Sequence, residues 1–188
     1  MHVLPNGSFN LDAFKFIKEK CRGTEGTCYH GISRINRQDY AIKRARVYRD
    51  NEGVPYYMMR ELAALRKMKN KHICELLLIN LNDFKLHLIF PYVERTLHDY
   101  MNPHVSSSYY VIIADGNHLT LCLLKGGSLS GQPLKKTQVR SLTYQLLDAV
   151  SYCHKRGIVH RNLKPKHLLI IPGNGDDPLD NAQLKLGM

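Results

Sequence analysis

Two glycines in a short polar loop are the first residues of this sequence that could do chemistry. The segment Cys21-Arg22-Gly23-Thr24-Glu25-Gly26-Thr27-Cys28 lies between two predicted strands. Glycine lets a backbone approach phosphate groups closely and present its N–H donors to them, so Gly23 and Gly26 are candidate anion-binding residues. Taken alone, a loop of this kind is more often a plain hairpin turn.

A lysine and a glutamate further along the chain could form an ion pair beside that loop. Lys43 ends the strand-like stretch Tyr40-Ala41-Ile42-Lys43, and Glu61 lies early in a predicted helix. An isolated pair on the surface contributes little to stability. The glycine loop before the pair and the segment HRNLKP after it favour a shared site over a surface pair.

The segment HRNLKPKHLLI, residues 160–170, holds the third group of polar residues. The amide of Asn162 can orient a hydroxyl, but an amide is not a base at physiological pH. His167 adds an imidazole to the same segment.

A strand-rich first half must position these residues. The pattern predicts short strands between about 13 and 46, a helix over 55–69, and two further strands at 73–81 and 85–93. Pro55 suits the first turn of the helix. Its apolar residues recur at helical spacing, at Met58, Leu62, Leu65 and Met68. The order of these elements predicts a small α+β lobe.

The second half is predicted to contain two helices separated by a hairpin. A short helix is expected over 94–102 and a longer one over 136–155. Between them, residues 104–129 contain two β-rich runs about an Asp115-Gly116 turn. One face of the long helix is apolar, with Val139, Leu142, Leu146 and Val150.

In their order, these segments resemble a serine/threonine protein kinase, in particular the cyclin-dependent kinases. The sequence YAIK is similar to the family's VAIK strand, EGVPYYMMRE to its EGVPSTAIRE helix, and HRNLKP to its catalytic loop. The resemblance implies an α+β kinase-like fold. Its N-lobe and hinge, at 1–93, would hold a β-sheet with one prominent helix, and 94–188 would form an incomplete helical C-lobe. Residues 104–129 and a segment around 172–182 look like insertions.

The resemblance also implies roles for single residues. Lys43 would neutralise nucleotide phosphates and pair with Glu61, and Lys164 would steady the transferred phosphoryl group. Phe90 takes the gatekeeper position, and Pro91-Tyr92-Val93 is the hinge that hydrogen-bonds adenine. The other positions implied to contact ATP are Gly23, Gly26, Cys28, Ala41 and Leu169.

Three departures from the family concern the base and the metal. Asn162 stands in the place of the catalytic aspartate, and loss of a general base typically costs about 10²–10⁴ in rate. His167 replaces a metal-binding asparagine. Met188, where the sequence stops, falls at the metal-binding aspartate of the DFG motif. The retained residues imply that the chain can bind ATP. The three replacements argue against binding of Mg²⁺.

Three functions follow from these residues. The first is a catalytically impaired pseudokinase that binds ATP and, through the helix at 53–69, a cyclin or cyclin-like protein. The second is a non-functional fragment or incomplete gene model, favoured by the stop at the DFG position and by the insertion at 104–129. The third is a weakly active serine/threonine kinase.

Composition narrows the classes of partner. The 188 residues carry a net charge of +11, yet the basic residues are spread through predicted helices and aromatic residues are not interleaved with them. This argues against nucleic-acid binding. No apolar run reaches the roughly 20 residues of a transmembrane helix, and the start lacks a signal-peptide pattern. We expect an intracellular protein, nuclear or cytoplasmic, that does not bind membranes.

The cysteines predict thiols rather than a metal site. There are five, and none has CxxC spacing. Free thiols are therefore favoured over a zinc site or a disulfide framework.

Overall fold

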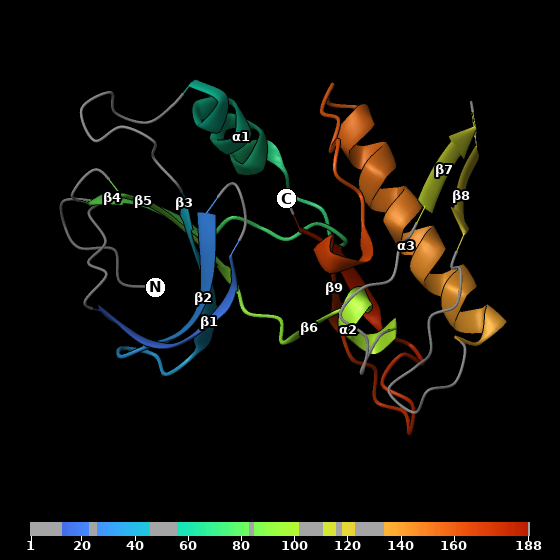
Figure 1. Cartoon of the computed structure of the whole chain (residues 1–188), viewed down its shortest axis with the longest axis horizontal. Helices are drawn as coiled ribbons and strands as arrows, with labels where there is room; N and C mark the ends of the chain where they lie inside the picture. The colour runs from blue at the N-terminus through green and yellow to red at the C-terminus, as the bar shows by residue number, and fades with distance from the viewer. Residues whose placement is uncertain are drawn as a thin grey trace. The chain divides into compact units, whose positions relative to one another are not determined.

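The computed structural model describes residues 13–22, 26–45, 56–82, 85–101, 111–115, 118–122 and 134–187. They fall into two compact units (Figure 1). The first extends to Lys67 and includes Glu75–Tyr92, and the second combines Met68–Cys74 with the chain from Val93 onward.

The first unit contains an antiparallel sheet of five strands in the order β1-β2-β3-β5-β4. The strands are β1 (Phe14–Arg22), β2 (Gly26–Ser33), β3 (Asp39–Ala45), β4 (Leu78–Asn82) and β5 (Lys85–Pro91). One face of the sheet packs around Phe14, Ile42 and Ile89, which are almost fully buried. The fold prediction of a kinase-like α+β lobe built on a β-sheet is confirmed.

The prominent helix of this unit, α1, runs over Tyr56–Lys67 and confirms the helix predicted at 55–69. Its buried residues follow the predicted spacing, with Met58, Leu62 and Leu65 each less than 8% exposed. Arg66 and Lys67 lie in the last turn, where positive charge interacts favourably with the helix dipole.

The second unit is built on one long helix and a small sheet. The helices are α2 (Leu97–Met101) and α3 (Lys136–His154), with a 3₁₀ turn at Pro165–His167. Strands β6 (Arg95–Thr96), β9 (Leu168–Ile171) and β10 (Gln183–Leu186) form a sheet in the order β10-β9-β6. Strands β7 (Val111–Asp115) and β8 (His118–Cys122) pair as the predicted hairpin.

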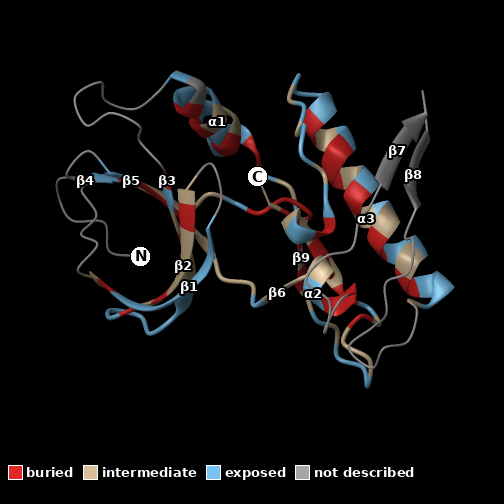
Figure 2. Ribbon diagram, viewed as in Figure 1, coloured by how far each residue is buried: buried red, intermediate tan, exposed pale blue. Residues whose placement is uncertain are grey.

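The core of the second unit gathers residues that are distant in sequence. Leu142, Leu146 and Val150 form the buried stripe of α3 that Figure 2 shows in red, as its apolar spacing predicted. Met68 and Ile73 belong to the same buried cluster. The backbone N–H of Cys74 donates to the carbonyl of Leu186, and the N–H of Leu186 donates to the carbonyl of His72, both at 2.8 Å.

The strand predicted at 73–81 is wrong in its first half, because β4 begins only at Leu78. Ile73 and Cys74 are instead buried in the second unit, where Ile73 makes an isolated bridge to Leu186. The apolar run that predicted one strand is thus divided: its first residues belong to the second unit, and its later residues belong to the first.

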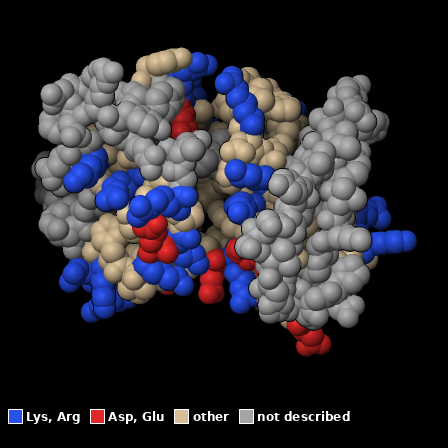
Figure 3. All heavy atoms as spheres, viewed as in Figure 1, with Lys and Arg blue, Asp and Glu red and all other residues tan. Residues whose placement is uncertain are grey.

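The charged residues are dispersed. Figure 3 shows Lys and Arg side chains scattered over the visible surface of both units rather than gathered in one patch. Among the helices that the structure describes, none is long and apolar enough to cross a bilayer.

Candidate active site

An ion pair joins the sheet of the first unit to its helix. Nζ of Lys43 on β3 lies 3.1 Å from Oε1 of Glu61 on α1, and the two side chains are 16% and 30% exposed. The partial burial reduces solvent screening of the pair. The structure therefore brings together the two residues, eighteen apart, that the sequence proposed as partners.

Three predicted site residues share one face of the sheet with Lys43. Cys28 lies directly opposite Lys43 in the β2–β3 pairing, and Ala41 lies directly opposite Phe90 in the β3–β5 pairing. Opposite residues and residues two apart project from the same face of a sheet. Cys28, Ala41 and Phe90 thus form an apolar surface next to the Lys43 ammonium, on the face opposite to Ile42.

Gly26 begins β2 in a conformation that side chains rarely adopt. Its φ is +150°, and a Cβ there would lie 2.2 Å from the carbonyl oxygen of Arg44. The pairing of β2 with β3 therefore requires glycine at this position, whatever the loop binds. Gly23 lies outside the described residues.

The segment 160–167 of the second unit is held by hydrogen bonds of its two imidazoles. The Asn162 N–H donates to Nδ1 of His160 at 3.2 Å, so Nε2 of His160 carries the hydrogen that it donates to the Gly187 carbonyl at 2.7 Å. Nδ1 of His167 donates to the Asn162 carbonyl at 2.9 Å. Together these bonds fix the backbone on both sides of Asn162.

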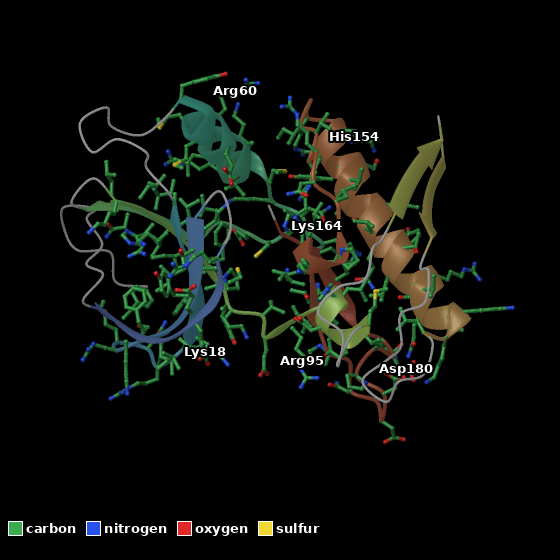
Figure 4. All side chains as sticks on the ribbon, viewed as in Figure 1. Lys18, Arg60, Arg95, His154, Lys164 and Asp180 are labelled. Atoms are coloured by element: carbon green, nitrogen blue, oxygen red, sulfur yellow. The ribbon has the colours of Figure 1, made fainter. Side chains whose placement is uncertain are left out.

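The side chains of Asn162 and Lys164 are exposed. Lys164, labelled in Figure 4, directly precedes the buried Pro165 that starts the 3₁₀ turn. The hydrogen bonds from Asn162 to His160 and from His167 to Asn162 use the backbone of Asn162. The side-chain amide of Asn162 can therefore orient a hydroxyl, but it cannot accept a proton as a base does.

The remaining predicted positions lie in the second unit. Val93 is half-buried, and so is Leu169, which pairs with Lys185 and Thr96 in the small sheet. Met188 lies outside the described residues. Among the residues that are described, no three His, Cys, Asp or Glu side chains are grouped to hold a metal ion.

Two features near the predicted site were missed by sequence reasoning. Cys21 lies directly opposite Cys28 in the β1–β2 pairing. The ring of Tyr92, in the predicted hinge, stacks on His30 of β2 with centroids 3.9 Å apart. Two cysteines flanking one glycine loop were the available signal for the first, and no sequence signal pointed to the second.

Comparison with known proteins agrees with this arrangement. The protein kinase domain family matches residues 14–186. The chain is 33% identical over 152 residues to "Cell division control protein 2 homolog 3" of Trypanosoma brucei brucei, which covers 81% of this chain and 40% of that protein. It is 30% identical over 173 residues to "Cyclin-dependent kinase 1" of Encephalitozoon cuniculi (strain GB-M1), which covers 92% of this chain and 49% of that protein.

The chain thus spans less than half the length of either relative. Its matched region includes the strand of Lys43, the helix of Glu61 and the loop of Asn162. The family binds ATP. The chain belongs to the protein kinase domain family and is similar to the cyclin-dependent kinases.

Proposed function

We propose that this chain is a kinase-derived binding module that holds ATP and a protein partner and is impaired in phosphate transfer. One observation carries the proposal: the Lys43–Glu61 pair is formed, while an amide stands at the position of the catalytic base. The proposed lobes are residues 1–93 for the nucleotide and hinge and 94–188 for a partial helical lobe.

The first unit offers chemistry suited to a nucleotide. The Lys43 ammonium can neutralise phosphate oxygens, and the Glu61 carboxylate restrains that ammonium. The neighbouring surface of Cys28, Ala41 and Phe90 can pack against an aromatic base. When bound, ATP would supply the transferable phosphoryl group, and these residues would bind and orient it.

The catalytic segment supports impairment. Asn162 cannot remove a proton from a substrate hydroxyl, and Lys164 keeps only the charge that would steady a phosphoryl group. Nδ1 of His167 is hydrogen-bonded to the loop, and imidazole nitrogen is a poor ligand for Mg²⁺. These donors do not fit a magnesium ion, so we assign no step to one.

Helix α1 is the proposed partner surface. Tyr56 and Met59 are 73% and 55% exposed on it, and a cyclin or cyclin-like protein is the expected partner. A cyclin pull-down of the unmodified chain and of Met59→Glu tests this assignment. Capture of the unmodified chain alone is expected, and equal capture of both would exclude α1 as the binding surface.

Nucleotide binding is tested by thermal melts with ATP, with ATP plus a chelator, and without ligand. The melting temperature should rise with ATP in the unmodified chain and in Lys15→Ala, an exposed lysine of β1 that serves as control. It should not rise in Lys43→Ala. No rise in the unmodified chain would overturn the nucleotide assignment, and a rise abolished by the chelator would show that a metal is needed.

Impairment is tested by phosphate transfer from Mg-ATP to a generic serine/threonine substrate in the presence of cyclin. The unmodified chain should transfer no more phosphate than Lys43→Ala. Transfer above that background would support the alternative, a weakly active kinase in which Asn162 is tolerated.

A further inference from the structure

A one-residue shift in the strand pairing places two cysteines face to face at the end of the first hairpin. Glu19 pairs with Tyr29, but the register then shifts, so that Cys21 rather than Lys20 lies opposite Cys28. The next pair, Arg22 with Thr27, closes the hairpin. Without the shift, Cys21 would lie opposite Thr27.

The geometry of this pair suits a disulfide. Directly opposite residues of antiparallel strands have Cα atoms about 4.5–5.5 Å apart. Disulfides span Cα separations of about 4.4–6.8 Å, so the bond can form without a large movement of the strands. The two thiols are reduced in this structure.

The two cysteines differ in exposure and charge. Cys21 is exposed, whereas Cys28 is half-buried. The hydrogen bond from the Cys28 thiol, the Cys28 backbone N–H and the Lys43 charge lower the pKa of Cys21 to about 6, although partial burial opposes them. Glu19 also opposes this shift, but its carboxylate is paired with Arg22 at 2.9 Å.

We propose that Cys21 is a peroxide-reactive thiolate and that Cys28 resolves its oxidised form into a reversible disulfide across β1 and β2. The Cys21 thiolate attacks one oxygen of a hydroperoxide, ROOH. The O–O bond breaks, Cys21 becomes a sulfenic acid, and the alkoxide leaves as ROH after taking a proton. Cys28 sulfur then attacks Cys21 sulfur and displaces hydroxide, which leaves as water with the thiol proton.

The reaction balances as two thiols plus ROOH giving one disulfide, ROH and water. The sulfurs are oxidised and the peroxide is reduced, and a dithiol reverses the reaction by exchange. The consequence for ligand binding rests on the proposed function. Cys28 shares the sheet face of Lys43, so the disulfide would alter the surface offered to a nucleotide and reduce the ATP-induced rise in melting temperature.

The first test treats the whole chain with hydrogen peroxide and reads its mass without reductant. Loss of two hydrogen masses is expected, reversed by dithiothreitol. Trypsin cuts after Lys20, Arg22 and Arg34, so the disulfide joins the dipeptide Cys21-Arg22 to peptide 23–34. Failure to find this linked pair, or oxidation of the buried Cys74 and Cys153 at the same rate, would overturn the proposal.

Two variants separate the roles. In Cys28→Ala the Cys21 sulfenic acid should persist and be trapped by dimedone, whereas in Cys21→Ser no sulfenic acid should form. Sulfenic acid that persists at Cys21 while Cys28 is intact would exclude Cys28 as the resolving residue. Should a variant fail to fold, iodoacetamide alkylation of the unmodified chain still tests the thiolate, because the rate at Cys21 should reach half its plateau near pH 6.

These outcomes are independent of nucleotide binding. If the linked peptides are found but ATP does not raise the melting temperature of the reduced chain, the disulfide proposal stands and the nucleotide site is rejected. If ATP raises the melting temperature but the linked peptides are not found, the nucleotide site stands and the disulfide proposal is rejected.

Discussion

Nε2 of Gln138 donates a hydrogen bond of 2.8 Å to Oδ1 of Asp180, forty-two residues further along the chain. The same nitrogen lies 2.8 Å from Oδ2 of Asp177, and Oε1 of Gln138 accepts from the Lys135 N–H at 3.0 Å. Lys135 adds a charge contact of 2.8 Å to Asp180. The polar segment before β10 is thereby attached to the start of α3.

Removal of this buried amide should destabilise the second unit. Gln138 is 3% exposed, whereas the side chains of Asp177 and Asp180 are 27% and 37% exposed, so Gln138→Ala removes a buried amide and its hydrogen bonds to two carboxylates. The expected loss in unfolding free energy is about 1–3 kcal/mol. Urea unfolding measures it, with the exposed Lys136→Ala as the control that should change little. Equal effects of the two variants would contradict this account.

Neutralisation of Glu61 should weaken ATP binding more than folding. In Glu61→Gln the Lys43 ammonium loses its ionic partner and is less well placed for phosphate. We expect a threefold to tenfold loss of ATP affinity, equivalent to about 1 kcal/mol, and a smaller change in the free energy of unfolding. Calorimetric titration with ATP measures the first. The exposed Glu75→Gln removes the same charge elsewhere and should leave the affinity unchanged.

Restoration of an aspartate at position 162 should not disturb the fold. The loop is held through the Asn162 backbone, and the side chain is exposed. For Asn162→Asp we therefore expect a stability change within about 0.5 kcal/mol, measured by thermal melting. His160→Ala, which removes the acceptor of that backbone N–H and the bond to Gly187, should be clearly less stable. A large loss in Asn162→Asp would mean that the asparagine serves the structure.

Stability should fall on mild acidification because of His87. This residue of β5 is 5% exposed, and among the described residues its Nδ1 has no hydrogen-bond partner. Burial is the main cause that lowers the pKa of His87 below 6.5, and the charges of Arg44 and Lys85 act in the same direction, while a hydrogen bond to the backbone carbonyl of Lys85 opposes them. As the pH falls through 6.5, the unfolded chain therefore binds a proton that the folded chain refuses.

The contribution of His87 is thus complete above pH 6.5 and declines below it, by at most about 1.4 kcal/mol per pH unit. Unfolding at pH 7.5 and at pH 5.5 measures the decline. His87→Leu should reduce the difference between the two values, whereas the exposed His154→Gln should not. An unchanged difference in His87→Leu would exclude this histidine as the cause.

Local pattern was sufficient to predict the elements that hold the candidate site. The spacing of Met58, Leu62 and Leu65 predicted α1, and the apolar face of α3 predicted its core contacts, because each helix buries one stripe. The kinase resemblance proposed the Lys43–Glu61 pair, which the structure contains. The ATP contacts of Gly23, Val93 and Leu169 remain predictions.

The misses depend on contacts that no local pattern encodes. Ile73 belongs to an apolar run that suits a strand equally well, but it is buried in the core of the second unit, where it makes a bridge to Leu186. The opposition of Cys21 and Cys28 depends on a register shift at Lys20, which spacing cannot show. The segment around 172–182 looked like a polar insertion, yet Leu179 and Ala182 belong to the buried core, and Gln138 and Lys135 bind the aspartates of the segment.

The placement of Met68–Cys74 in the second unit has a consequence for synthesis on the ribosome. Nδ1 of His72 donates a hydrogen bond to the carbonyl of Leu184, which is synthesised 112 residues later. At roughly 5–20 residues per second, that interval lasts about 6–22 s. During this time the first sheet can fold, but Met68 and Ile73 cannot yet be buried, because the later residues of their core have not been synthesised. A chaperone that binds short apolar segments would find one there in every newly made chain.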